Sequence, residues 1–190
     1  MNTRYPPSMP PTLSRRAFLF SAAALAASPS LALAADDPAA LITAIYKRAA
    51  AGKGDSGGQF MWLRARSRPR WLSAPLIKLW AEADSKVEKG DMGPPGFDPV
   101  TNSQDPLVRA YTGKVEKQDG QTATVAATFR THNAKSVTVR YDLVRERGTW
   151  KIDDIRGDVD GEKWEMRKML RDFLVLMKEL KEKELKKKAG

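Results

Sequence analysis

The chain has 190 residues, of which 42% are hydrophobic and 29% charged, a balance typical of a single globular domain. It contains no cysteine and one histidine, which excludes disulfides, thiolate nucleophiles, cysteine-bound zinc, iron–sulfur clusters and multi-histidine metal sites. A formal net charge of +10 points to anionic partners or surfaces without identifying one.

The first 34 residues have the organisation of an export signal. An arginine pair precedes a mild, alanine-rich apolar run that ends in a small-x-small cleavage pattern; the signal residues are Ser14, Arg15, Arg16, Phe18 and Leu19, with Ala32 and Ala34 at the cut. This pattern resembles a twin-arginine signal peptide. The apolar run is too weak and too interrupted to remain as a membrane anchor. Phe20 stands where such signals commonly have lysine, which leaves the general secretory route as the alternative.

Export predicts a periplasmic or secreted protein that meets the translocation machinery and keeps no stable membrane span. Residues 1–34 carry three arginines and no acidic residue, so the remaining 156 residues keep a formal charge of +7. Twin-arginine cargo folds before export, as the resemblance implies, and a chain without cysteines needs no oxidising compartment to fold. Because phosphate-binding loops, haem-attachment pairs and metal-ligand spacings are absent from the sequence, no cofactor or metal is expected.

The first half of the domain, residues 35–190, is predicted to be helical. A helix begins at Pro38 and ends near Ala51, and the glycine-rich stretch 52–58 is a linker. Ser73 is the expected N-cap of a second helix that ends at Gly90. Residues 90–106 form a loop with four prolines and three glycines, which is too long for a simple connector.

Arginines and aromatic residues alternate between the two predicted helices, over residues 60–71. If this segment is extended, its arginines lie on one side and form a candidate patch for phosphates or acidic lipids: Arg64, Arg66, Arg68 and Arg70. The alternative is a solvated edge whose tryptophans fill the core.

From Leu107 onwards apolar residues recur at every second position, which is the spacing of a β-strand with one buried face. Four strands are expected, at about 107–117, 122–130, 137–143 and 150–155, in an antiparallel meander with one wet face. A long C-terminal helix begins near Gly161 and buries a methionine-containing stripe, either as core or as a partner groove. Residues 181–190 form a lysine-rich tail that projects or frays.

The predicted fold class is therefore α+β, with N-terminal helices packed on a curled four-stranded meander. Three motifs, Phe97-Asp98-Pro99, Ser103-Gln104-Asp105 and Trp150-Lys151-Ile152-Asp153-Asp154-Ile155, resemble an uncharacterised family of exported bacterial proteins, domain of unknown function 3828. That family is similar to the nuclear-transport-factor-like, cystatin-like cone fold. The resemblance implies a fold but no reaction, and it transfers no catalytic residue.

Strand parity indicates one candidate site inside the cone. Asp154 falls on the apolar face of the fourth strand, so the candidate pocket consists of Phe129, Tyr141, Trp150 and Asp154. A buried carboxylate there, together with Tyr141, suits general-base catalysis. The alternative is a latch in which Asp154 accepts backbone bonds from residues 104–105. His132 is expected to cap a hairpin turn.

Two functions from different classes follow. The first is a non-enzymatic envelope protein that binds a small ligand, an anionic polymer or a protein partner, because export and basicity are clear whereas catalytic constellations are not. The second is a small cofactor-free isomerase or cyclase that uses the carboxylate in the cone. No nucleic-acid partner is expected, since export removes the protein from those targets. A dimer through the outer sheet face is possible for this fold, and the oligomeric state stays open.

Overall fold

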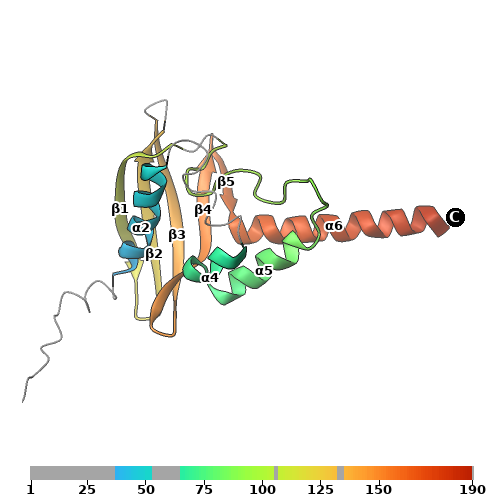
Figure 1. The fold of residues 1–190 in the computed structure, drawn as a ribbon, viewed down its shortest axis with the longest axis horizontal. Helices are drawn as coiled ribbons and strands as arrows, with labels where there is room; N and C mark the ends of the chain where they lie inside the picture. The colour runs from blue at the N-terminus through green and yellow to red at the C-terminus, as the bar shows by residue number, and fades with distance from the viewer. Residues whose placement is uncertain (1–36, 53–64, 105–106, 132–134, 190) are drawn as a thin grey trace, which may run out of the picture.

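A computed structural model describes residues 37–52, 65–104, 107–131 and 135–189. They form the expected α+β fold, with a five-stranded antiparallel sheet in the order β1-β2-β3-β4-β5 and helices against it (Figure 1). The sheet is curled and does not close into a barrel. The predicted export signal, Arg64, His132 and the turn at 133–134 lie outside the described residues.

The sheet is a meander in chain order. Its strands are β1 (Arg109–Gln118), β2 (Thr122–Arg130), β3 (Ser136–Glu146), β4 (Thr149–Val159) and β5 (Glu162–Glu165). The fifth strand corrects the prediction that residues from Gly161 onwards are helical. Asp160 and Gly161 both have positive φ, 52° and 93°, which is the geometry of a two-residue hairpin turn. The chain therefore folds back on β4, and Trp164 lies in a strand.

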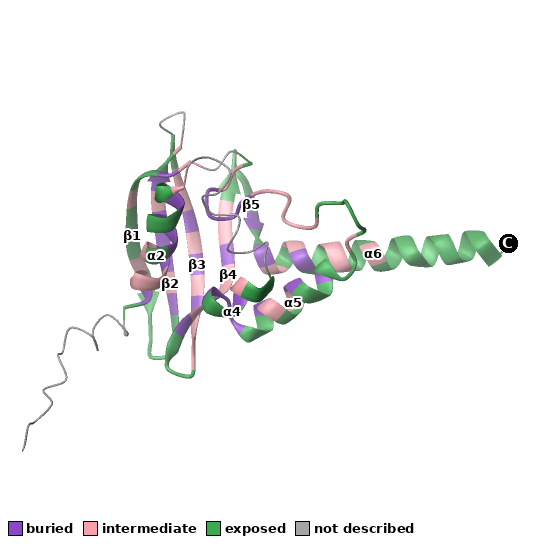
Figure 2. Cartoon of the chain, viewed as in Figure 1, coloured by how far each residue is buried: buried purple, intermediate pink, exposed green. Residues whose placement is uncertain are grey.

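Helix α2 (Pro38–Ala51) packs against β1 and β2 and agrees with the predicted bounds. The Asp37 carboxylate caps it by accepting the Ala39 amide at 2.8 Å, and proline occupies the first turn. Ile42, Ile45 and Tyr46 of this helix are wholly buried, and buried stretches are coloured on both α2 and the strands beside it (Figure 2). The core of this half of the molecule thus lies between α2 and the inner face of the meander.

A second group of helices packs at the β4 end of the sheet: η1 (Ala65–Ser67), α4 (Arg68–Trp71) and α5 (Ala74–Asp84). Residues 65–71 are helical, so the condition on which the arginine patch depended, an extended segment, is not met there. Ser73 caps α5 as predicted, accepting the Leu76 amide at 3.2 Å, and its own amide donates to the Ile152 carbonyl at 2.8 Å. Helix α5 ends at Asp84, six residues before the predicted end.

The loop after α5 leads to β1, and helix α6 (Met166–Ala189) ends the described chain. Within α6, Met166 and Leu170 are buried, whereas the second half extends away from the sheet and is exposed (Figure 2). None of the helices in the described ranges is both long enough and apolar enough to cross a bilayer.

Candidate functional site

A β-bulge in β4 decides where the predicted catalytic carboxylate lies. Asp142 pairs with Asp154 and Leu143 pairs with Ile152, so Asp153 is the extra residue on β4. The bulge reverses the parity of the strand beyond it. Asp154 therefore lies with Asp142 on the outer face, away from Tyr141, and the prediction that Asp154 opens into the cone is wrong.

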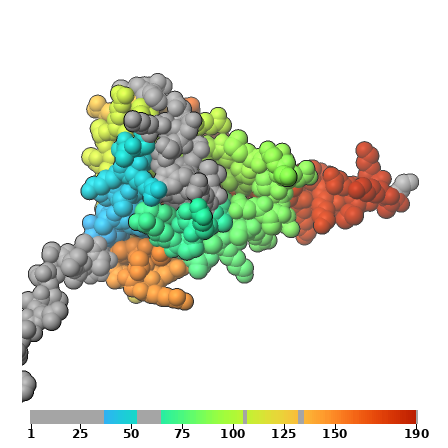
Figure 3. Space-filling model, viewed as in Figure 1, coloured from blue at the N-terminus to red at the C-terminus, as the bar shows by residue number. Residues whose placement is uncertain are grey.

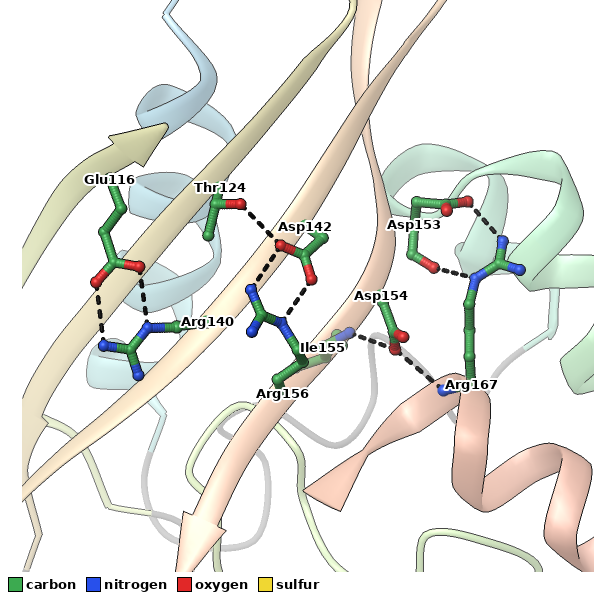
Figure 4. A network of polar contacts seen from close by, with 9 residues as sticks. All are labelled: Glu116, Thr124, Arg140, Asp142, Asp153, Asp154, Ile155, Arg156 and Arg167. Carbon is green, nitrogen blue, oxygen red and sulfur yellow. Dashed lines mark hydrogen bonds and ion pairs between the residues drawn. The ribbon is translucent and has the colours of Figure 1, made fainter. Parts of the chain in front are cut away.

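Asp154 acts as a cap in this position. One carboxylate oxygen accepts the Ile155 amide at 2.8 Å and the Arg167 amide, in the first turn of α6, at 3.0 Å (Figure 4). Burial raises the pKa of Asp154 above its ordinary value, while the two amide bonds and the Arg167 charge oppose that shift. Asp154 therefore accepts backbone bonds, as the latch requires, from Ile155 and from Arg167 of α6, and Asp105 of the expected latch lies outside the described residues.

The bulged Asp153 joins three elements beside this cap. Its carboxylate accepts the Ser73 hydroxyl and the Arg167 guanidinium, both at 2.6 Å. The Asp153 carbonyl accepts a second Arg167 bond, also at 2.6 Å. Since Ser73 caps α5 and Arg167 belongs to α6, the two consecutive aspartates attach the ends of both helices to β4.

The outer sheet face is occupied by paired charges (Figure 4). Arg140 forms two bonds to the Glu116 carboxylate, at 2.9 and 3.1 Å, and Arg156 forms two to Asp142, at 2.6 and 2.9 Å. The Thr124 hydroxyl also donates to Asp142. The bonds to Asp142 raise the pKa of Arg156. Glu116 thus links β1 to β3 across β2, and Asp142 links β3 to both β2 and β4, so both carboxylates have a structural role.

Aromatic rings fill the inner face, where the pocket was expected. The Tyr46 ring stacks on Tyr111 at 4.5 Å and contacts Phe129 and Tyr141 at 5.3 and 6.1 Å between centroids. The Tyr141 hydroxyl donates to the Tyr46 hydroxyl at 3.1 Å, which donates to the Val100 carbonyl at 2.7 Å. Burial raises the pKa of both hydroxyls well above the ordinary tyrosine value, so both remain protonated.

The last predicted pocket residue, Trp150, is also a packing residue. It is 4% exposed, and the Arg145 guanidinium covers its ring at 4.6 Å. The four predicted pocket residues are therefore divided, with three buried in the core and Asp154 on the outer face.

The predicted arginine patch is also divided. Arg68 is 3% exposed, bonds to the Asp84 carboxylate at 2.6 Å and lies 4.7 Å above the Trp80 ring. It therefore belongs to the core and is not part of an exposed stripe. Arg66 and Arg70 remain exposed, and Arg70 covers the Trp71 ring at 4.8 Å.

The buried arginine marks a groove that sequence reasoning did not locate. The groove, of about 670 Å³, lies between the C-terminal end of α5 and the proline-rich loop. Its walls are mainly apolar and aromatic, and its lining residues are Arg68, Trp80, Asp84, Val87, Asp91, Met92, Gly93, Pro94, Pro95, Gly96, Phe97, Asp98, Pro99 and Gln104.

Specific bonds hold the loop wall of the groove in place. Asp98 is wholly buried, and its carboxylate accepts the Val100 amide at 3.0 Å and the Thr101 hydroxyl at 2.9 Å. Phe97 packs edge-on against Trp164 of β5, with the centroids 5.0 Å apart. The Phe97-Asp98-Pro99 motif therefore anchors the loop to the sheet and shapes the groove.

Among the lining residues that the structure describes, the charge is opposite to that of the chain as a whole. Three of them carry carboxylates, Asp84, Asp91 and Asp98, and one, Arg68, carries a guanidinium. The Asp98 carboxylate is buried within the loop, whereas Asp91 is exposed and the Asp84 side chain is 45% exposed. A ligand in the groove thus meets apolar walls and two accessible carboxylates.

A metal site is not apparent in the part of the chain that the structure describes, where no three histidine, cysteine or acidic side chains are grouped to hold an ion. The groove carboxylates do not form such a group either, because Asp84 pairs with Arg68 and the Asp98 carboxylate accepts the backbone amide of Val100.

Comparisons with known proteins give little beyond this geometry. No family model matches the chain, and no curated protein matches it. Among solved structures, it is similar to a protein of unknown function from Bacteroides thetaiotaomicron VPI-5482, with 21% identity and a TM-score of 0.39 over 67% of this chain and 94% of that one. The resemblance to the exported bacterial family stays a prediction.

Proposed function

We propose that the protein is an exported binding module that holds a small, largely apolar ligand with a cationic group in the groove beside α5. The groove itself carries the proposal: about 670 Å³ of space, lined by aromatic, proline and methionine side chains, with carboxylates at its edge. Small-molecule sites commonly have this size, with mostly apolar walls and a few placed polar groups.

The charge of the groove selects among ligands. The Arg68 guanidinium is buried and paired with Asp84, so it offers little to an anion. Asp91 and the exposed part of Asp84 attract a cation instead. The ligand that fits best is therefore an aromatic or aliphatic amine of modest size.

The geometry does not favour the alternative of a cone-type isomerase. Such an enzyme needs a carboxylate and a proton donor around one open cavity. Here Asp154 accepts backbone amides on the outer face, and Tyr141 is wholly buried against Tyr46 on the inner face. The two predicted catalytic groups cannot meet a common substrate.

Calorimetric titration with three matched probes tests the proposal: 4-phenylbutylammonium, neutral 4-phenylbutanol and anionic 4-phenylbutyrate. We expect the ammonium to bind most tightly and the carboxylate least. Asp91→Lys is expected to weaken ammonium binding about tenfold, in line with the loss of one exposed attraction and the gain of one repulsion. Glu162→Lys, on the exposed edge strand β5, is the control of equal charge change. Equal binding of the three probes, or equal effects of the two variants, would contradict the proposal.

Export is a separate part of the proposal, and it is supported by the Ser14-Arg15-Arg16 pattern and the apolar run that follows. Cell fractionation of the full chain tests it, with Arg15→Lys/Arg16→Lys as the variant. We expect the wild-type chain in the periplasmic fraction, shortened at Ala34, and the double variant retained at full length in the cytoplasm. Equal export of both chains would remove the twin-arginine route and favour general secretion.

A further inference from the structure

Helix α6 is longer than the domain requires. Its first half packs on α5, β4 and β5, with Met166 and Leu170 buried and Met177 partly buried. Every residue from 178 to 189 is exposed. In the space-filling view this half extends beyond the rest of the described chain (Figure 3). The domain core does not account for these last three turns.

The exposed half combines leucines with lysines. Leu176, Leu180 and Leu185 are 51%, 44% and 59% exposed, although leucine usually packs inside. Between residues 178 and 188 the helix also carries six lysines and three glutamates, and the lysines are Lys178, Lys181, Lys183, Lys186, Lys187 and Lys188. Exposed leucines among an excess of lysines are typical of helices that lie on membrane surfaces.

Helical spacing places two of the three glutamates away from the side that Met177, Leu180 and Leu185 share, whereas Leu176, nine residues before Leu185, lies outside that side. Leu180 and Lys181 follow Met177 by three and four residues, and Lys188 follows by eleven, so all lie on one side. Glu179 and Glu182 fall on the other side, and Glu184 is the one acidic residue near the leucines. The side that holds Met177, Leu180 and Leu185 therefore also carries Lys181 and Lys188 against the single charge of Glu184.

We propose that residues 174–189 of α6 dock the protein on an anionic phospholipid surface, with leucines among the headgroups and lysines on the phosphates. Charge complementarity carries the choice of partner, since each lysine near such a surface adds to the attraction. A second copy fits less well, because two tips with the same lysine excess repel each other. A soluble polyanion would use the lysines but would leave the leucines without a role.

Co-sedimentation of the full chain with vesicles tests the proposal. We expect binding to vesicles of phosphatidylglycerol and phosphatidylcholine, little binding to phosphatidylcholine alone, and loss of binding as salt increases. Lys186→Gln/Lys187→Gln/Lys188→Gln is expected to weaken binding about a hundredfold. The control with the same charge loss changes Lys47, Lys114 and Lys117 to Gln, which are exposed on α2 and β1, and it is expected to change binding less than about threefold.

A second variant separates docking on lipid from attraction to charge alone. Leu176→Gln/Leu180→Gln/Leu185→Gln keeps every charge and, with glutamine, a good helix former. We expect at least a tenfold loss of vesicle binding, with helix content by circular dichroism and binding to dextran sulfate unchanged. Vesicle binding equal to wild type in this variant would overturn the proposal, and so would equal weakening by the two lysine triples.

Discussion

Asp154 offers the sharpest test of whether the outer-face carboxylate is structural or catalytic. Two substitutions separate the acceptor from the charge. Asp154→Ala removes the oxygen that accepts the Ile155 and Arg167 amides at 2.8 and 3.0 Å. Asp154→Asn keeps a side-chain oxygen in the same place and removes only the charge.

The expected magnitudes follow from those two bonds. An unsatisfied, partly buried donor costs about 1–3 kcal/mol, and loss of a helix cap costs about 0.5–2 kcal/mol. Because water reaches part of this site, we expect Asp154→Ala to lower the free energy of unfolding by about 2 kcal/mol. For a domain of this size that corresponds to a fall in Tm of about 4–8 °C. Asp154→Asn is expected to stay within about 0.5 kcal/mol of wild type.

The pH dependence gives a second, independent readout. Burial raises the pKa of Asp154 in the folded protein, so the folded state disfavours its ionised form. Its contribution to stability is therefore fully present below the ordinary aspartate pKa, and it is lost as pH rises through the raised folded value. Relative to Asp154→Asn, the wild type should be most stable in acid and should lose that advantage towards neutrality.

Urea unfolding of the three proteins at several pH values measures both effects. Equal losses in Asp154→Ala and Asp154→Asn would refute the cap, because they would show that the charge matters more than the acceptor. A difference between wild type and Asp154→Asn that grows as pH rises, in favour of wild type, would refute the sign of the argument.

Three further predictions concern the core and the groove wall. Asp84→Ala removes the carboxylate that pairs with the buried Arg68 guanidinium and should lower the free energy of unfolding in urea by about 2 kcal/mol. Arg68→Met should lower it less, because methionine can pack on Trp80. The reverse order would contradict the ion-pair argument. Tyr46→Phe removes the hydroxyl that bonds to both the Val100 carbonyl and the Tyr141 hydroxyl, and it should lower the free energy of unfolding by about 2–3 kcal/mol. Tyr141→Phe removes one bond and should lower it by about 1 kcal/mol. Equal losses in the two variants would contradict this account. Calorimetry should show that Leu170→Ala lowers the free energy of unfolding by about 2–5 kcal/mol, because Leu170 is buried, and that Leu185→Ala lowers it by less than about 0.5 kcal/mol. A large loss in Leu185→Ala would show that the end of α6 packs on the domain and would contradict this account.

Local rules predicted the regular elements well. Ser73 has a side chain that caps helices, and it caps α5 as predicted. Alternation placed Phe129 and Tyr141 correctly on the buried face. The fifth strand was missed although its turn signal was present, because the apolar spacing around Trp164 fits the start of a helix as well as a strand.

The candidate site could not be predicted in the same way. Strict alternation assumes an unbroken ladder, and the bulge at Asp153 reverses the parity of every residue after it. Arg68 was assigned to a surface stripe because its partner, Asp84, lies sixteen residues away and only helix packing brings them together. No sequence motif predicts the groove, because the end of a helix and an irregular loop form it together. The only signal in the sequence was the length and the proline content of that loop.

Chemical-shift mapping of the full ¹⁵N-labelled chain with 4-phenylbutylammonium tests the central claim most directly. The account predicts saturable shifts confined to the groove, at the Trp80 indole N–H and the amides of Gly93, Gly96 and Phe97, with little change on the outer sheet face. Shifts centred on Asp142, Asp154 and Arg156 instead, or no saturable shifts at the groove, would contradict it.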